Sequence, residues 1–255
     1  MWIEDPPDAA PAGLAPPGRA RQARSEPTGR DPWPNRRGAI PASGHRFNVP
    51  EPVVDELTSS AGAQRGGKLA SRLADATHAY DHERYQEARR ILRPLAEEAP
   101  GAVAVRELQG LSLYRMGQWA AAARELEAYR SLSGSYDQHP VLADCYRALR
   151  RFGAADELWD DLRQASPSAE LVAEGRIVAA GCRADRGDLA EAIAVLERAG
   201  RRLRHPEDHH LRQWYALADL YERAGDLPRA RELFGRIVST DPDAYDARRR
   251  LRSLR

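Results

Sequence analysis

Apolar residues recur with helical spacing from about Leu69 to the end of the chain, and one alanine marks the period of the pattern. This alanine returns after 34, 33, 37 and 38 residues, with a large apolar residue four positions after it and another three positions before it. Residues three and four apart share one face of a helix, so the pattern predicts an amphipathic helix around each alanine. The five alanines are Ala88, Ala122, Ala155, Ala192 and Ala230.

A second small residue precedes each of these alanines by 12 positions. It predicts a first helix that crosses the second one closely, because only a small side chain lets the two backbones approach. Glycines directly after Met116, Arg186 and Ala224 predict the left-handed residue that ends a first helix. The small residues of the first helices are Ala76, Gly110, Ala143, Ala180 and Ala218.

These spacings predict an all-α fold of five helix-turn-helix repeats. Pro100, Pro167 and Pro242 close three of the repeats, since proline does not continue a helix. The first repeat has the weakest pattern, because Asp75 and Ala79 stand where large apolar residues are expected. We expect the repeats near residues 69–102, 103–136, 137–170, 173–207 and 211–244.

Residues 245–255 are predicted to form a capping helix, because the last repeat would otherwise expose its apolar face to water. Leu251 and Leu254 would face that repeat. The arginines around them are expected to be mostly solvated, namely Arg248, Arg249, Arg250 and Arg252.

The last repeat has the clearest motif, Trp214-x-x-Leu217-Ala218-x-x-Tyr221 followed by Ala230-x-x-x-Phe234 and Pro242. This motif resembles the tetratricopeptide-repeat family, with alanine where the first helix usually carries glycine. The resemblance covers roughly residues 69–255, and the segments 142–149 and 229–234 resemble uncharacterised members of the family from actinobacteria. It implies an α-solenoid, in which helix pairs stack side by side.

The resemblance also implies a concave groove lined by the first helix of each repeat, with the positions between the packing residues facing inward. Aromatic, acidic and basic side chains mix at these positions, which suits a peptide or helix that makes apolar and charged contacts. The candidate groove residues are Tyr80, Tyr114, Arg115, Asp144, Arg147, Ile177, Asp185, Tyr215, Asp219, Glu222 and Arg223.

The same inward positions argue against one binding mode of the family. Some members clamp the C-terminal carboxylate of a chaperone with lysine, asparagine and arginine side chains. Where lysine is needed, this chain carries Leu73, Glu107, Pro140, Ile177 and Tyr215. Where asparagine is needed, it carries Thr77, Leu111, Asp144, Gly181 and Asp219. A role in binding chaperone tails is therefore not expected.

Residues 1–66 differ in composition, because prolines are dense there and large apolar residues are too few to offset the entropy of ordering. We expect a disordered Pro/Gly/Arg-rich arm, with Val53–Leu57 as a short helical turn on the repeats. Whether this arm extends the reach of the protein or occupies the groove stays open at this point.

Overall charge and cysteine content narrow the class of protein. Charged residues make up 30% of the chain and leave a formal net charge of +1, which gives no general reason to expect nucleic acid or an acidic membrane as partner. Two cysteines cannot form the disulfide framework of a small secreted domain. The chain shows no signal-peptide pattern and no apolar run near the roughly 20 residues that span a bilayer. We expect a cytoplasmic protein.

Candidate chemistry is sparse. His205, His209 and His210 lie near Glu207, and we interpret them as helix-capping and solvated side chains rather than metal ligands. No phosphate-binding loop, nucleophile elbow or dinucleotide motif occurs. We predict no metal, no cofactor and no enzymatic activity.

The prediction is thus a non-catalytic scaffold or adaptor that binds a segment of another protein in its groove. The alternative is a helical repeat protein associated with RNA or DNA through arginines near both ends of the chain, whose phosphate contacts would weaken with salt. The arm contributes Arg19, Arg21, Arg24, Arg36 and Arg37 to that alternative, but acids stand among them. The identity of the partner and the oligomeric state stay open.

Overall fold

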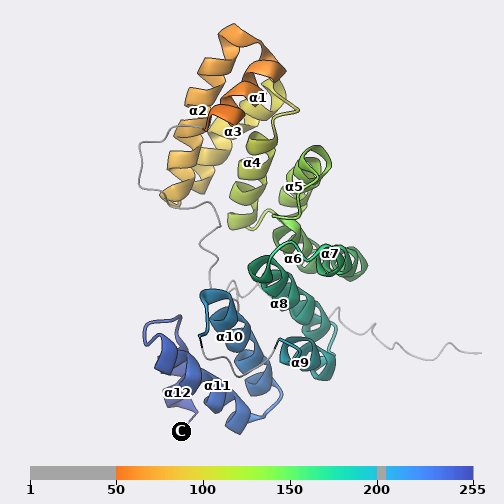
Figure 1. The fold of residues 1–255 in the computed structure, drawn as a ribbon, viewed down its shortest axis with the longest axis vertical. Coiled ribbons are helices and arrows are strands. Elements are labelled where there is room, and N and C mark those ends of the chain that lie inside the picture. Colours follow the sequence, from red (N-terminus) through yellow and green to blue (C-terminus); the bar gives the residue numbers. More distant parts are fainter. Residues whose placement is uncertain (1–49, 200–204, 255) are drawn as a thin grey trace, which may run out of the picture. The chain divides into compact units, whose positions relative to one another are not determined.

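The computed structural model describes residues 50–199 and 205–254, and helices are the regular secondary structure of these ranges (Figure 1). The all-α prediction is confirmed. None of the described helices combines the length and the apolar content needed to cross a membrane. The helices are α1 (Glu51–Ala61), α2 (Ala63–Asp81), α3 (Tyr85–Glu98), α4 (Val103–Arg115), α5 (Trp119–Ser133), α6 (His139–Ala148), α7 (Phe152–Ala165), α8 (Ala169–Asp185), α9 (Leu189–Glu197), α10 (Asp208–Arg223), α11 (Leu227–Thr240) and α12 (Ala247–Ser253).

Ten of these helices form five consecutive pairs, one in each predicted repeat: α2–α3, α4–α5, α6–α7, α8–α9 and α10–α11. The fourth pair begins before its expected limit at residue 173, because Ser168 caps α8. The Ser168 Oγ accepts a hydrogen bond from the Leu171 N–H over 3.1 Å, which satisfies one of the free donors at the helix start.

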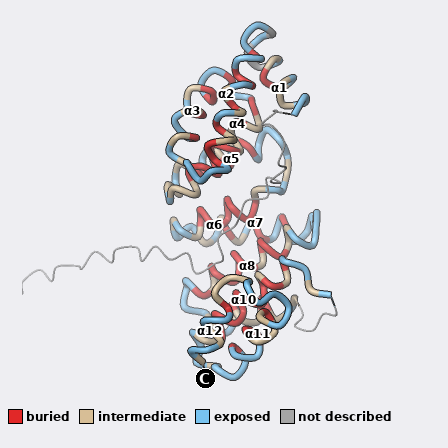
Figure 2. The backbone as a smooth tube through the Cα atoms, turned by 90° about the vertical axis from the view of Figure 1, so that its left-hand side faces the viewer, coloured by how far each residue is buried: buried red, intermediate tan, exposed pale blue. Residues whose placement is uncertain are grey.

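The first helices of the pairs lie side by side. Contacts join α2 to α4, α4 to α6, α6 to α8 and α8 to α10, and we call these five helices the first-helix row. The helices α3, α5, α7 and α9 each pack between their own first helix and the first helix of the next repeat, and α11 packs between α10 and α12. Buried positions follow the faces where neighbouring helices meet, as Figure 2 shows.

The small residues that set the period lie where two helices cross. The five alanines of the second helices are between 0% and 2% exposed. At Gly110 a Cβ atom would lie 2.7 Å from the Cδ2 of Leu126, which is closer than real side-chain atoms approach. The first helix of the second repeat therefore has no room for a side chain at this crossing.

Every described pair turns through one residue with positive φ, five positions before the alanine of the second helix. Glycine takes this place in three repeats, at Gly117, Gly187 and Gly225. Glu83 and Arg150 take it in the other two, with φ of 60° and 59°. The turn geometry is thus common to all five pairs, although only three of them carry the glycine that this conformation favours.

The helical part begins before the predicted boundary at residue 66. The helix α1 packs on α2 and buries Leu57 completely, and the Glu56 carboxylate accepts a hydrogen bond from the Val103 N–H. The predicted turn around Val53–Leu57 is therefore part of a helix of 11 residues. Residues 1–49 of the predicted arm lie outside the described residues.

The C-terminal helix α12 packs on α11, but not as the sequence predicted. Ala247 is fully buried, and Arg250, three positions later on the same face, is 18% exposed. The guanidinium of Arg250 lies 2.8 Å from the Asp219 carboxylate and 2.7 Å from that of Glu222. The prediction that Arg250 is mostly solvated is wrong, because its position on the packed face directs its long side chain onto these two acids.

We expect Gly110→Ala to lower the free energy of unfolding by about 1 to 2 kcal/mol, because the fully buried Leu126 cannot move away from the added methyl group. Gly235→Ala in α11 is the matched control, because an added Cβ there meets no atom within 4 Å. The control should gain about 0.5 to 1 kcal/mol from its higher helix propensity. Urea denaturation followed by far-UV circular dichroism measures both, and shifts of the same sign would contradict the close crossing.

Arg250→Ala should lower the free energy of unfolding by about 2 kcal/mol, because it leaves the buried Asp219 carboxylate without its cation. The control is Arg248→Ala, since Arg248 is exposed and its nearest carboxylate, that of Asp243, is 4.0 Å away. This control should change stability by less than about 0.5 kcal/mol. Equal thermal midpoints for the two variants would show that Arg250 does not hold α12 in place.

Candidate functional site

The first-helix row carries a pocket of about 430 Å³. Its lining comes from α2, α4, α6, α8 and α10 and from the connections that precede α6 and α8. Apolar and aromatic side chains lie there beside carboxylates and guanidiniums. We call it the first-helix pocket, and it is lined by Tyr80, Glu107, Leu111, Tyr114, Arg115, Asp137, Gln138, Pro140, Val141, Ser168, Glu170, Leu171, Glu174 and Arg212.

Glu107 of α4 is half-buried in the wall of this pocket, and Gln138 Nε2 donates a hydrogen bond to its Oε1 over 2.8 Å. Burial raises the pKa of Glu107, while the hydrogen bond from Gln138 favours the charged form and opposes that shift. No cationic side chain of the described residues makes an ion pair with Glu107. The carboxylate therefore relies on a neutral partner.

Two tyrosines form the aromatic part of the pocket. Tyr80 of α2 is 7% exposed, and burial raises its pKa to about 12, so its hydroxyl stays protonated at neutral pH. The Tyr114 hydroxyl of α4 donates a hydrogen bond to the Asp144 Oδ2 over 2.6 Å. Tyr114 thus connects the pocket to the polar residues of the next repeat.

On the opposite side, Arg212 of α10 reaches α8. Its Nη1 lies 2.6 Å from the Glu174 Oε1, and its Nη2 contacts Asp208. Burial alone would lower the pKa of Arg212, but the two carboxylates raise it above its ordinary value. The positive charge of Arg212 is therefore matched within the protein.

Beside the pocket lies a polar network that joins three repeats. Arg147 of α6 lies 2.8 Å from the Asp144 Oδ1 and 3.0 Å from the Asp185 Oδ2, and only 13% of its side chain is exposed. Burial alone would lower the pKa of Arg147, but these two carboxylates raise it. Because Tyr114 also bonds Asp144, the network links α4, α6 and α8.

At the last repeat, three of the candidate groove residues face α12. The Tyr215 hydroxyl donates a hydrogen bond to the Asp246 Oδ1 over 2.6 Å. Asp219 and Glu222 bind the guanidinium of Arg250, which lies over the Tyr215 ring at 5.6 Å from its centroid. The capping helix therefore occupies this part of the first-helix row.

The 11 candidate groove residues thus fall into separate environments. Ile177 is buried and Arg223 is exposed, and neither lines the first-helix pocket. The pocket contains only Tyr80, Tyr114 and Arg115 of the whole set. The remaining members divide between the Arg147 network (Asp144, Arg147, Asp185) and the contact with α12 (Tyr215, Asp219, Glu222).

Several pocket residues were absent from the candidate set, among them Gln138, Val141, Glu174 and Arg212. Glu107, Leu111 and Pro140 were considered only as positions where a carboxylate clamp would need lysine or asparagine. Glu107 and Pro140 stand three residues before the small residue of their first helix, and Leu111 stands one residue after it. The repeat pattern predicts that these positions face inward, so it could have indicated these three residues as pocket residues. Gln138 and Val141 come from a connection and a helix start, where the repeat period predicts little, whereas Glu174 and Arg212 stand at equivalent positions, six residues before the small residue of their first helices.

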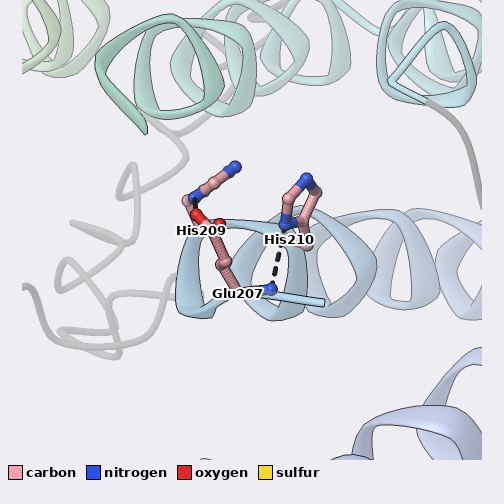
Figure 3. A group of neighbouring side chains, drawn as sticks. All are labelled: Glu207, His209 and His210. Carbon is pink, nitrogen blue, oxygen red and sulfur yellow. Dashed lines mark hydrogen bonds and ion pairs between the residues drawn. The ribbon is translucent and has the colours of Figure 1, made fainter. Parts of the chain in front are cut away.

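The described residues hold one group of three side chains with the elements of a metal site, Glu207, His209 and His210, whose potential ligand atoms lie within 4.8 Å of one another (Figure 3). The Glu207 N–H donates a hydrogen bond to the His210 Nδ1 over 3.1 Å, as part of the cap of α10. Neutral His210 then carries its proton on Nε2, so neither of its nitrogens offers a lone pair to a metal while the cap is intact. The geometry of the cluster is explained by capping.

Comparison with known proteins matches two parts of the chain to family models described as tetratricopeptide repeat, at residues 73–137 and 211–251. The first match contains α3, α4 and α5, and the second contains α11 and most of α10. No curated protein matches the chain. The similarity to actinobacterial proteins stays a prediction.

Among solved structures, the chain is similar to the crystal structure of a thermophilic tetratricopeptide-repeat protein of Thermus thermophilus. The TM-score is 0.57 with 19% sequence identity, over 73% of this chain and 98% of the other. At this identity the similarity concerns the fold alone. The two matched segments, the recurring small residues and this shared fold together support a tetratricopeptide-repeat protein.

Proposed function

We propose that this protein is a non-catalytic scaffold that binds a peptide or helical segment of another protein in the first-helix pocket. The tetratricopeptide repeats suggest protein interaction in general terms. The observation that supports the specific proposal is the pocket itself, whose lining combines apolar, aromatic and charged side chains from all five first helices. We include in the proposal the cytoplasmic location expected from the sequence.

The composition of the pocket favours binding over catalysis. Ser168 is its one aliphatic hydroxyl, and that oxygen already accepts the capping hydrogen bond from Leu171. Glu174 is paired with Arg212, so this carboxylate is held by a cation. The apolar Leu111, Pro140 and Val141 offer contacts for side chains of a bound segment.

No specific observation favours the nucleic-acid alternative. The Arg250 guanidinium is bound by Asp219 and Glu222, and Arg249 pairs with Asp246. Two of the C-terminal arginines are therefore already matched by acids and add little to phosphate binding. The arginines at positions 19–37 lie outside the described residues.

Leu171→Arg should abolish capture of protein partners, because it places a long charged side chain at a half-buried, apolar position of the pocket lining. Leu132→Arg is the matched control, since Leu132 is 46% exposed at the end of α5 and does not line the pocket. The measurement is affinity capture from the native host by the full chain, quantified by mass spectrometry, and then titration calorimetry with each purified partner. We expect affinity at least tenfold weaker for Leu171→Arg and unchanged for the control.

Both variants need circular dichroism spectra and thermal midpoints close to those of the wild type for this comparison. If the folded Leu171→Arg protein captures the same partners with the same affinity, the pocket is not the binding site and the proposed function of this site fails.

A further inference from the structure

The charges in the first-helix pocket do not cancel. Its lining holds the carboxylates Glu107, Asp137, Glu170 and Glu174 and the guanidiniums Arg115 and Arg212, so four negative charges face two positive ones. One positive charge, that of Arg212, is bound to Glu174 over 2.6 Å. The pocket therefore has an excess of negative charge, and this excess favours a cationic group on whatever enters it.

Glu107 is the acid for which this excess matters most. It is half-buried on α4, and its hydrogen-bond partner in the described part of the chain is the neutral amide of Gln138. A partly desolvated carboxylate gains more from an opposite charge than an exposed one does, because less water screens the interaction. Asp137 and Glu170 are exposed at the rim, where they attract a cation without holding it in one geometry.

The first-helix row already binds a guanidinium between carboxylates at the last repeat. Arg250 of α12 lies between the carboxylates of Asp219 and Glu222, at 2.8 Å and 2.7 Å. Its guanidinium also lies over the rings of Phe234 and Tyr215, at 4.8 Å and 5.6 Å from their centroids. Acids and aromatic rings of one repeat thus suffice to bind an arginine side chain in this protein.

The pocket holds the same kinds of group, a carboxylate beside aromatic rings, although its carboxylate stands at another repeat position, and no described cation pairs with that carboxylate. Tyr215 and Glu107 are equivalent positions, each three residues before the small residue of its first helix. The pocket adds the rings of Tyr80 and Tyr114 and the apolar surface of Leu111. An arginine side chain needs these elements, since its stem packs on apolar groups while its planar head bonds to a carboxylate.

We propose that the first-helix pocket recognises a basic side chain, arginine in preference to lysine, on the bound segment of a partner protein, and that Glu107 is the carboxylate that receives it. This inference rests on the proposed function, because it names the chemistry of the segment bound at the same site. Asp137 and Glu170 increase the rate of encounter, and Glu107 determines which residue of the segment enters.

The test uses the full chain and a random dodecapeptide library displayed on phage. Peptides selected on the wild type should share an arginine or lysine at one recurrent position. The selected peptides are then synthesised and titrated against the wild type, Glu107→Gln and Glu232→Gln. Glu107→Gln removes the charge and retains the shape of the side chain, and Glu232→Gln makes the same change on α11, outside the pocket.

We expect Glu107→Gln to weaken binding about tenfold and Glu232→Gln to change it less than about twofold. Replacing the recurrent basic residue of the peptide by glutamine should weaken binding to the wild type by the same factor. The same peptide replacement should not weaken binding to Glu107→Gln any further, because both changes remove the same interaction between the basic residue and Glu107.

Three results would count against the inference, and they separate it from the proposed function. In the first, the selected peptides no longer bind to Leu171→Arg, but they share no basic residue or bind equally well to Glu107→Gln. This result would overturn the inference and leave the proposed function in place. A library that yields no peptide sensitive to Leu171→Arg would count against both. A wild-type dimer that Glu107→Gln converts to a monomer without peptide would show that a second copy, not a separate partner, occupies the pocket.

Discussion

The structure depends on the close crossing of the two helices within each repeat. The alanines of the second helices are essentially without exposed surface, and Gly110 leaves no room for a Cβ atom beside Leu126. A close crossing brings the large apolar residues on either side into contact, which buries the core of each pair. Because all five pairs cross in the same way, their first helices come to lie beside one another in a single row.

Polar contacts between repeats then decide what this row offers to a partner. The network of Asp144, Arg147 and Asp185 is bound to Tyr114 of the preceding repeat, so the middle of the row is occupied by its own charges. Removing one member would leave a partly buried charge unmatched, which is costly in a low-dielectric environment. The network therefore holds the repeats in register more than it serves as a contact surface.

The two ends of the row differ for the same reason. At the last repeat, Arg250 of α12 satisfies Asp219 and Glu222, and the Tyr215 hydroxyl is bonded to Asp246. At the second and third repeats, Glu107 has Gln138 as its partner and the surrounding lining stays open as a pocket. Charge matching inside the protein thus closes one end of the row and leaves a negatively charged pocket nearer the other.

The amino-acid pattern by itself determined the helix pairs, their number and the residues at each crossing, because a local period reports directly which side chains share a helix face. It also placed a helix after the last repeat. Only the tertiary structure decided which inward side chains are available, because the period does not say which of them pair: Tyr114 and Asp144 meet at a separation that differs from the repeat step, and the pairing of Arg212 with Glu174, at equivalent positions of adjacent repeats, depends on how their side chains pack. For the same reason α1 and the role of Arg250 could not be read from periodicity: both depend on packing against a neighbouring helix rather than on the spacing of residues along the chain.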